Sequence, residues 1–459
     1  NAMAVLERQL IAYCFDRWVA TGVSEDAIAP KLGAVLNGLQ QTPNKAQQDF
    51  PNNLLSFIDE HQEQLLSRFV QLFTELDEEG QAHLRAFIGL QTAEVEQGAV
   101  INAEQAEHTP LSWRIVNRLK ELLDSRESHR ARAVDLKKNH DALQKQPADP
   151  ARNQLLEDLK RERSAVLDLI KSINEQLTLN FFTDEGLLPN YAFPEEGVTL
   201  NSIIVRKKDK AQHAADSSDS YEQVTLKFQR PAQAALNELV PDNVFYVSEH
   251  KINIEQVDLK LSTPSEWRMC PSCHYNEDVT LSGDKHSACP RCGDPYWADV
   301  QQKQSLLKLR QVYARANSRY DRIGDDSDQR EPKFFRRQLL IDIDPKNCRN
   351  AMRIDNPEVP FGFEFVRSAS LREVNFGEQF GEHNNFSVAG KTSVRNGFQI
   401  CRHCGMVRRK KPKPGQFEHA LDCKLSRPDS VETEADWFES LYLFRELKSE
   451  AVRILLPLA

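Results

Sequence analysis

Seven of the nine cysteines in this chain fall into two groups whose spacing is typical of metal binding. The first group consists of two CxxC pairs separated by fifteen residues, and its members are Cys270, Cys273, Cys289 and Cys292. Zinc takes four tetrahedral ligands, and each CxxC turn supplies two of them at the required separation. Gly293, directly after the second pair, can adopt the left-handed backbone that closes such a turn. The sequence therefore predicts a four-cysteine zinc ribbon.

A second set of metal-ligand side chains lies closer to the C-terminus. Its members are Cys401, Cys404, His419 and Cys423. Three thiolates and one imidazole also make a tetrahedral zinc site, although His403 or Cys348 could replace one of these ligands. Both sets provide four protein ligands and no open coordination position, which indicates structural rather than catalytic metal. We therefore expect two structural zinc ions (Zn2+) as the cofactors of the chain.

Disulfide bonds and redox chemistry are the alternative uses of paired CxxC turns. We expect no signal peptide here, and the cysteines are not distributed as in a secreted disulfide framework. A thioredoxin-like site would consist of one CxxC at the start of a helix, not of two proline-containing pairs at ribbon spacing. The cysteine pattern therefore favours metal binding in a reducing, cytoplasmic setting.

Length and composition predict a soluble protein of two or three domains. The chain has 459 residues, of which 40% are hydrophobic. No apolar run reaches the roughly 20 residues that a membrane-spanning helix needs, so we expect no contact with a membrane. The first three residues resemble the remnant of a tag, and the chain ends in the apolar stretch 454–459. We therefore expect this chain to be a piece of a longer protein, with its last domain truncated.

Charge is distributed unevenly along the chain, although the net charge is only −9. Residues 1–110 contain six Lys and Arg against sixteen Asp and Glu, whereas residues 395–427 contain nine against two. Local patches rather than the net charge decide whether a protein binds nucleic acid. The acidic balance of the whole chain therefore does not exclude binding to DNA.

The first 180 residues show helical periodicity. Residues 4–110 predict an acidic helical domain, in which apolar side chains recur at helical spacing after a start at Asn52 or Asn53. Residues 111–180 predict a helical hairpin arm with a turn at 147–150. We expect Val116 to pack at the base of the arm and Arg126 to lie near an exposed, basic tip. Such a tip is either a solvated charged face or an element that contacts DNA.

After residue 180 the pattern becomes mixed, so the predicted fold class is α+β and multidomain. The segment 181–300 predicts strands near 198–205, 224–228, 244–247 and 252–259, then the four-cysteine ribbon with Trp267 and Trp297 packed against it. The segment 301–459 predicts a basic helix over 303–322, a strand from 339 to 343 and two short strands over 361–376. The second metal set follows in this last segment.

Two motifs resemble parts of a nucleotide-hydrolysing site, and neither satisfies the chemistry. Ala389-Gly390-Lys391-Thr392 ends like a phosphate-binding loop, but Asn385 stands where the first glycine of that loop is required. Asp59-Glu60-His61-Gln62 resembles the acidic box of a helicase, but it lies within an amphipathic helix and follows no phosphate-binding loop. No other catalytic constellation is present, so we expect this chain not to be an enzyme by itself.

Clustered cations are the remaining residues that could act on a ligand. Five of them lie between ligands of the second metal set, namely Arg408, Arg409, Lys410, Lys411 and Lys413. A second predicted patch consists of Arg315, Arg319, Arg336 and Arg337. Clustered Lys and Arg displace counterions from phosphates and give an affinity that depends strongly on salt. A merely solvated charged loop is the alternative interpretation.

Several of these segments together resemble a known family. They are Gly186–Pro194 (Gly-Leu-Leu-Pro-Asn-Tyr-Ala-Phe-Pro), the region from Trp267 to Cys292, Phe361–Phe365, Arg372–Gly377 and Phe444–Pro457. Over residues 180–459 the chain resembles the zinc-bearing C-terminal accessory region of bacterial DEAD/DEAH-box superfamily-two helicases, a family that includes mitomycin repair factor-like and phage-defence helicases. Only the four cysteines of the first set match the metal site of that family, and both motor lobes are missing.

The resemblance implies a role beside an ATP-driven motor. The full-length protein would be an ATP-binding DNA helicase, and this chain would clamp or guide single-stranded or tailed duplex DNA for the motor lobes of the same chain. Repair and phage defence are the implied settings. The alternative is a protein–protein docking module of a repair or defence complex, in which the zinc sites only stabilise the docking surface.

Overall fold

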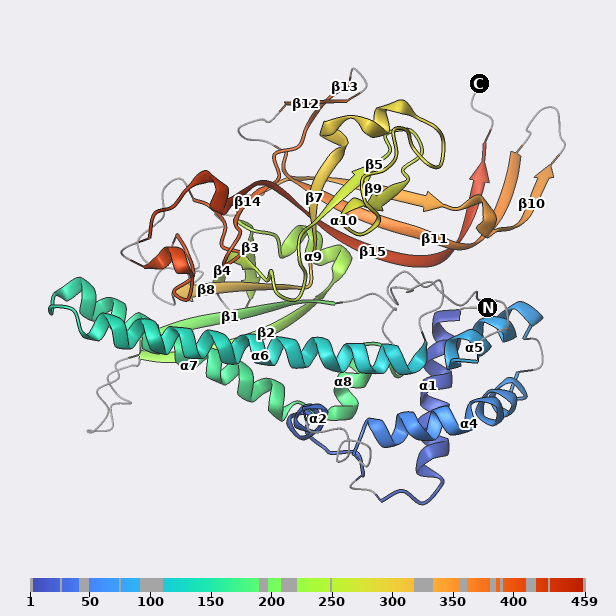
Figure 1. The fold of residues 1–459 in the computed structure, drawn as a ribbon, viewed down its shortest axis with the longest axis horizontal. Helices are drawn as coiled ribbons and strands as arrows, with labels where there is room; N and C mark the ends of the chain where they lie inside the picture. The colour runs from blue at the N-terminus through green and yellow to red at the C-terminus, as the bar shows by residue number, and fades with distance from the viewer. Residues whose placement is uncertain are drawn as a thin grey trace. The chain divides into compact units, whose positions relative to one another are not determined.

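The structure of the chain is a computed structural model (Figure 1). It describes residues 3–24, 27–40, 49–73, 76–90, 110–189, 197–207, 221–247, 250–317, 333–354, 361–379, 385–388, 391–409, 418–427 and 430–456. For residues 204–207, 221–225, 315–317, 385–388 and 391–394 only the backbone is described. The predicted mixed α and β composition is confirmed within these residues.

The chain divides into two compact units, which are described separately. The helical unit consists of residues 1–137 and 166–196, and the β unit consists of residues 138–165 and 197–459. Two long helices contribute to both units, because α6 runs from Leu111 to Gln144 and α7 from Pro150 to Glu175. Within the described residues, no helix is long and apolar enough to cross a membrane.

The other helices of the helical unit are short to medium in length. They are α1 (Met3–Val19), α2 (Leu32–Leu39), α4 (Asn52–Val70), α5 (Glu78–Ile88) and α8 (Thr178–Asp184). α4 begins at Asn52, as the sequence predicts. The carboxylate of Asp77 caps α5 by accepting a 2.9 Å hydrogen bond from the backbone N–H of Gly80. This bond satisfies one of the backbone donors that a helix start leaves without a partner.

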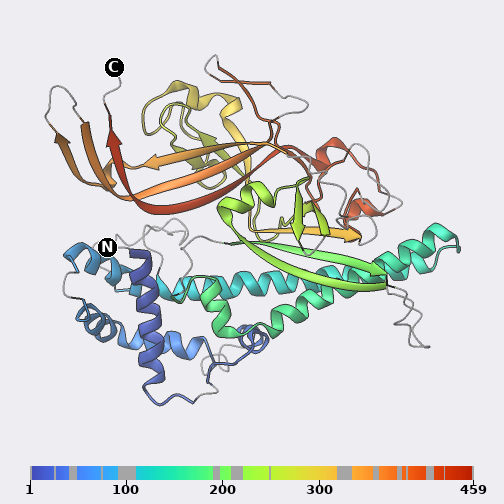
Figure 2. The same cartoon turned by 180° about the vertical axis from the view of Figure 1, so that it is seen from behind.

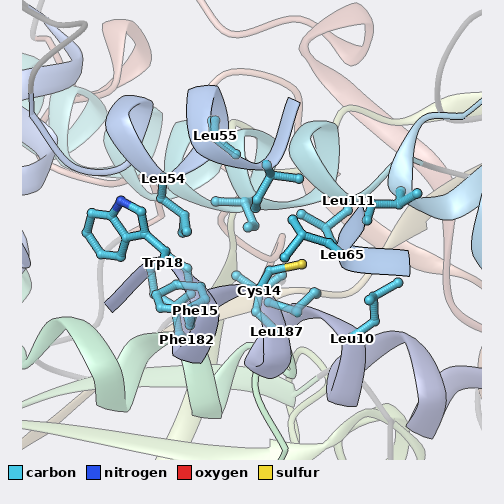
Figure 3. Packing of buried hydrophobic residues seen from close by; sticks show 14 of the residues in the cluster. Leu10, Cys14, Phe15, Trp18, Leu54, Leu55, Leu65, Leu111, Phe182 and Leu187 are labelled. Carbon is cyan, nitrogen blue, oxygen red and sulfur yellow. The ribbon is translucent and has the colours of Figure 1, made fainter. Parts of the chain in front are cut away.

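The apolar faces of these helices form one core. Figure 3 shows Trp18 of α1 close to Leu54 of α4 and Phe182 of α8, with Cys14 and Leu10 farther along α1 in the same apolar cluster. Burial of each such side chain contributes about 1.5–3 kcal/mol to the free energy of unfolding. Burial also raises the pKa of the Cys14 thiol to about 12, so this cysteine is an inert core residue rather than a nucleophile.

Arg126 of α6 does not lie near an exposed tip, as the sequence predicts, but in the interior of the helical unit. Its side chain is fully buried, and its terminal nitrogen Nη1 donates to the amide oxygens of Asn37 at 3.0 Å and Asn174 at 3.1 Å. Val116, expected to pack at the base, is 37% exposed instead. The heptad pattern missed this arrangement because amide oxygens of α2 and α7 accept hydrogen bonds from the terminal nitrogen of the buried guanidinium group, although its Nε has no hydrogen-bond partner among the described residues.

The β unit is built on two main sheets, in which most neighbouring strands are antiparallel. The smaller sheet has the order β2-β1-β8-β4-β3. Its strands are β1 (Gly197–Lys207), β2 (Tyr221–Pro231), β3 (Val244–Val247), β4 (His250–Val257) and β8 (Gln311–Asn317). The short helix α9 (Ala232–Glu238) follows β2. β1 lies between antiparallel β2 and parallel β8, so the sheet joins segments that are far apart in the sequence.

The larger sheet has the order β10-β11-β15-β7-β5-β6, with β9 beside β11 and β14 beside β15. Its strands are β5 (Ser265–Met269), β6 (Asn276–Asp278), β7 (Lys303–Lys308), β9 (Phe335–Ile343), β10 (Cys348–Ile354), β11 (Phe361–Glu378), β14 (Phe398–Cys401) and β15 (Trp437–Leu455). A separate pair consists of β12 (Asn385–Val388) and β13 (Lys391–Val394). Figure 2 shows β11 and β15 running side by side as the long centre of this sheet.

The predicted basic helix over 303–322 is wrong, because its described residues 303–317 contain the strands β7 and β8. Leu306 and Leu307 are adjacent and both fully buried, but they belong to two different apolar clusters. Adjacent side chains on a strand point to opposite faces, so a strand with a core on each face carries a continuous apolar run. Such a run cannot be distinguished from a helix by periodicity alone.

The segment 361–376 is a single strand rather than the predicted pair of short strands. β11 pairs with β15 from Gly362 to Asn375, and the register shifts between Val366 and Ala369. A β-bulge of this kind interrupts the alternation of side chains and bends the strand without ending it. The interrupted alternation explains why the sequence pattern resembles two short strands.

Candidate metal centres

The four cysteines of the first set meet at one point of the β unit. Their Sγ atoms all lie within 4.8 Å of one another, and Cys270–Cys292 and Cys273–Cys289 are each 3.6 Å apart. A tetrahedral ion with Zn–S bonds of about 2.3 Å would hold its sulfur ligands about 3.8 Å apart. A disulfide needs about 2.05 Å, so these cysteines are free thiols in a geometry that could hold a metal ion.

Backbone hydrogen bonds shape the two turns of the first centre. The N–H of Cys270 donates to the Tyr275 carbonyl at 2.7 Å, and the N–H of Cys289 donates to the Asp294 carbonyl at 2.9 Å. Gly293 has φ +74°, which confirms the left-handed backbone that the sequence predicts there. Each turn is therefore closed by its own backbone, and both turns point two thiols inward.

Only one of the two expected tryptophans packs against this centre. Trp297 is 1% exposed and lies in one cluster with Cys270 and Cys289. Trp267 instead contacts Phe444 of β15, with ring centroids 5.6 Å apart, and the guanidinium of Arg372 lies 4.0 Å from its ring. The difference follows from strand pairing, because β5 places Trp267 beside β7 rather than beside the cysteine turns.

Burial opposes ionisation of the thiols in the first centre. It raises the pKa of Cys270 to about 11 and also raises the pKa of Cys273. The exposed Cys292 differs, because a hydrogen bond from the backbone of Asp294 lowers the pKa of its thiol. Thiolates are the form that binds metal, and a cation at the centre would supply the missing counter-charge.

The second set also comes together as the sequence predicts. The ligand atoms of Cys401, Cys404, His419 and Cys423 lie within 4.8 Å of one another. Nδ1 of His419 is the nitrogen that faces the thiols, 3.8 Å from Sγ of Cys404. Bonds of about 2.3 Å to sulfur and about 2.05 Å to nitrogen would give a separation of about 3.6 Å. This centre could therefore hold a metal ion with one imidazole ligand.

The two alternative ligands of the second set lie elsewhere. Nε2 of His403 is 2.7 Å from a carboxylate oxygen of Asp436. Cys348 lies at the start of β10, and its Sγ is 3.9 Å from the backbone oxygen of Asn350. Neither residue belongs to the donor groups found among the described residues. The choice that the sequence left open is therefore resolved in favour of His419 and Cys423.

The second centre joins the two main sheets of the β unit. On one side, the N–H of Val257 on β4 donates to the Gly405 carbonyl at 3.0 Å, and the N–H of Val407 donates to the Glu255 carbonyl at 2.9 Å. On the other side, Cys401 pairs with Trp437 at the start of β15. The loss of this centre would therefore disturb both sheets at once.

A helix end also contacts the loop of the second centre. Asn139, near the C-terminal end of α6, donates a 3.0 Å hydrogen bond from Nδ2 to the Leu421 carbonyl. Leu421 lies between His419 and Cys423, and it is 5% exposed. The metal loop is thus held from three directions within the β unit, by β4, by β15 and by α6.

The two described arginines of the predicted cationic loop form ion pairs with carboxylates of the same chain. Arg408 donates both terminal nitrogens to Glu434, at 2.6 and 2.7 Å. Arg409 is only 11% exposed and donates to Glu255 at 3.2 Å, with Asp242 at 3.7 Å. Lys410, Lys411 and Lys413 lie outside the described residues. Both arginines therefore already bind oxyanions of the same chain.

The second predicted cationic patch is only partly described. Arg336 and Arg337 lie on β9 and are exposed, and Arg337 pairs with Glu373 at 3.3 Å. The backbone of Arg315 lies on β8, opposite Ile203 and Asn253, while its side chain is outside the described atoms. Arg319 lies outside the described residues altogether. β8 belongs to the smaller sheet and β9 to the larger one.

Two carboxylates near the second centre escaped the sequence analysis. Glu432 lies 3.1 Å from Nε2 of His419, and Asp436 accepts from the side chain of Thr433 and lies close to His403. An acidic residue within about 15 positions of a predicted histidine ligand is a weak signal, because loops contain many acids. Only the fold shows which carboxylate faces the ring.

Comparison of the chain with protein-family models, with curated proteins and with solved structures gives no match in any of the three.

Proposed function

We propose that this chain is a nucleic-acid-binding accessory region, stabilised by two structural zinc ions, that clamps or guides DNA for a helicase motor in the same full-length protein. The observation that carries the proposal is the second centre, whose ligands Cys404 and His419 close a loop containing five cations. A closed loop presents its charges at less conformational cost than a free one. The helicase context rests on the sequence resemblance alone.

The donor chemistry supports zinc as the metal. Four thiolates, or three thiolates and one imidazole, in a tetrahedral arrangement suit zinc better than harder cations, which prefer oxygen ligands. Each centre has four protein ligands, and closed sites of this kind stabilise folds rather than activate water. Zinc, when bound, would thus fix the two loops and supply positive charge to the thiolates.

The contacts of Arg408 support phosphate binding at the mouth of the loop. A guanidinium fork matches a carboxylate and a phosphate with nearly the same geometry. The bidentate bond between Arg408 and Glu434 therefore holds the arginine in a conformation that a phosphate could use. Glu434 is 72% exposed, so water screens this ion pair and a phosphate could displace the carboxylate from Arg408.

Reversal of the three lysines of the loop should weaken DNA binding at least tenfold at low salt. The change is Lys410→Glu, Lys411→Glu and Lys413→Glu together, and it leaves the ion pairs of Arg408 and Arg409 in place. Each lost phosphate contact should reduce the slope of log affinity against log salt by about 0.7 to 0.9. Fluorescence anisotropy with single-stranded, tailed and blunt duplex DNA over a salt series measures both quantities.

A matched control reverses the charge of four basic side chains that lie outside both predicted patches. Arg17, Arg68, Lys160 and Lys171 are all exposed, and their reversal changes the net charge even more than the loop variant does. This control should retain binding within about threefold at physiological salt, where long-range charge effects are screened. Equal losses in both variants would show a non-specific charge effect, and unchanged affinity in the loop variant would remove the loop from the proposal.

A second candidate function, a protein–protein docking module, is favoured by an exposed apolar face on the larger sheet. The register places Met352 of β10, Phe363 of β11 and Ile454 of β15 in one row, and Ile454 is 57% exposed. The exposed side chains of this apolar face are Met352, Ile354, Phe365, Val452, Ile454 and Leu456. Large exposed apolar faces are typical of protein contacts. Absence of DNA binding at low salt would favour this candidate.

A further inference from the structure

The histidine of the second centre has an ordered partner on the side away from the thiols. Nε2 of His419 lies 3.1 Å from Oε2 of Glu432, while Nδ1 faces the cysteines. The histidine side chain is 5% exposed, so this nitrogen is largely withdrawn from water. The two ring nitrogens of a buried imidazole both need partners, and here one faces the donor group and the other faces a carboxylate.

Glu432 is itself held in place by a second ring. Its other oxygen, Oε1, accepts a 2.7 Å hydrogen bond from Nε1–H of Trp437. Trp437 is 3% exposed, and its ring centroid lies 5.1 Å from that of His419. The backbone of Trp437 pairs with the ligand Cys401 on β14. The carboxylate is therefore anchored to the same strand pair that carries a ligand of the centre.

The neighbouring carboxylate Glu434 has a different partner. It forms the bidentate ion pair with Arg408, whereas the closest contact of Arg408 to Glu432 is 3.9 Å, which is too long for a hydrogen bond. The side chains at 432 and 434 thus separate two roles that carboxylates can have near a metal. One faces the ligand, and the other faces the predicted phosphate-binding arginine.

We propose that Glu432 is the positioning residue of the second metal centre. Its carboxylate accepts the Nε2–H of His419, fixes the tautomer that leaves the Nδ1 lone pair for the metal, and orients the ring toward the three cysteines. Carboxylates in this position raise the basicity of an imidazole ligand and strengthen metal binding. The inference rests on the proposed metal binding, and it adds a residue outside the four ligands that determines how firmly this centre retains its ion.

The test compares Glu432→Gln with Glu434→Gln in the full chain loaded with two equivalents of zinc. Competition with a chromophoric chelator measures the affinity of each site, and the four-cysteine centre serves as an internal reference. Glu432→Gln should weaken one of the two sites by about 10- to 100-fold, the range seen when such outer partners are lost. Glu434→Gln should change both sites by less than threefold.

Cobalt substitution provides a readout that a general loss of stability would not give. The Co2+ absorption bands of a centre with three thiolates and one imidazole depend on the imidazole ligand. Glu432→Gln should therefore shift the bands of one centre and leave those of the four-cysteine centre unchanged. Trp437→Phe removes the N–H that orients the carboxylate together with one ring of the buried indole, and it should weaken the same site by about threefold. Such a gradation follows from the indirect role of the tryptophan.

The outcomes separate this inference from the function on which it rests. If the unaltered protein binds two equivalents of zinc but Glu432→Gln retains wild-type affinity and cobalt bands at both sites, Glu432 has no positioning role. If the unaltered protein binds fewer than two equivalents, the proposed pair of zinc sites fails as well. A Glu434→Gln variant as weak as Glu432→Gln would show that negative charge in this loop, rather than contact with His419, is responsible.

Discussion

Removal of the metal by a chelator is expected to unfold the β unit while the helical unit stays folded. Both centres lie in the β unit, and the second one joins its two sheets through β4 and β15. Binding of zinc to such sites is coupled to folding, and in finger peptides it supplies about 10–16 kcal/mol. The helical unit has its own core and no residue of either donor set.

Circular dichroism separates the two units. Trp297 and Trp437 lie against the two centres, so the near-ultraviolet signal of the β unit should be lost after chelation. The helical signal at 222 nm should persist and melt later in a transition of its own. One intact melting transition for both signals, unchanged by chelation, would contradict the expected coupling.

Single ligand variants should show that the second centre contributes more to stability than the first. Cys423→Ser removes a buried ligand of the centre that joins both sheets, whereas Cys292→Ser removes an exposed ligand of a centre that packs mainly on Trp297 and Tyr275. Cys348→Ser is the matched control, because this cysteine belongs to neither group. It should leave metal content and the melting temperature unchanged.

The donor sets could be predicted from the sequence because their signal is local. A CxxC turn places two ligands by itself, so the spacing of Cys270, Cys273, Cys289 and Cys292 predicts a site before the fold is known. The choice of His419 over His403 was not local. It depends on the pairing of His403 with Asp436, and residues 33 positions apart give no pattern in one sequence.

The helices were also predictable where one face is apolar, as at the start of α4. The errors occurred where a strand is buried on both faces or where a polar side chain is buried. β7 has an apolar core on each face, so its sequence pattern resembles that of a buried helix. Arg126 is buried because amide oxygens from distant parts of the sequence accept hydrogen bonds from its guanidinium group. Both arrangements depend on tertiary partners, which override local propensity. The parallel pairing of β7 with β15 is likewise non-local.

Gly405→Ala is expected to destabilise the β unit far more than the same change at Gly293. The two glycines occupy equivalent positions, each directly after the second cysteine of a CxxC turn, and their φ angles are +77° and +74°. A left-handed backbone costs an alanine about 1–2 kcal/mol, and this cost should be the same at both positions. The cost of the left-handed backbone therefore cancels when the two variants are compared.

The surroundings of the two glycines differ, and this difference determines the result. A Cβ at position 405 would lie 2.0 Å from the carbonyl oxygen of Val257, whereas a Cβ at position 293 would meet nothing within 4 Å. The obstacle at 405 is backbone of β4, so the turn would have to leave the strand and lose the hydrogen bond from the N–H of Val257 to the Gly405 carbonyl. Such a displacement should bring the total cost at 405 to about 3–5 kcal/mol.

Urea unfolding of the zinc-loaded variants, followed by the near-ultraviolet signal of the β unit, measures both costs. Gly293→Ala should lower the free energy of unfolding by no more than about 2 kcal/mol and retain both metal equivalents. Gly405→Ala should show the larger loss together with weaker metal retention at one site, because the displaced turn carries Cys401 and Cys404. Equal effects of the two changes would mean that the second centre is not fixed against β4, and the coupling between that centre and the smaller sheet would have to be abandoned.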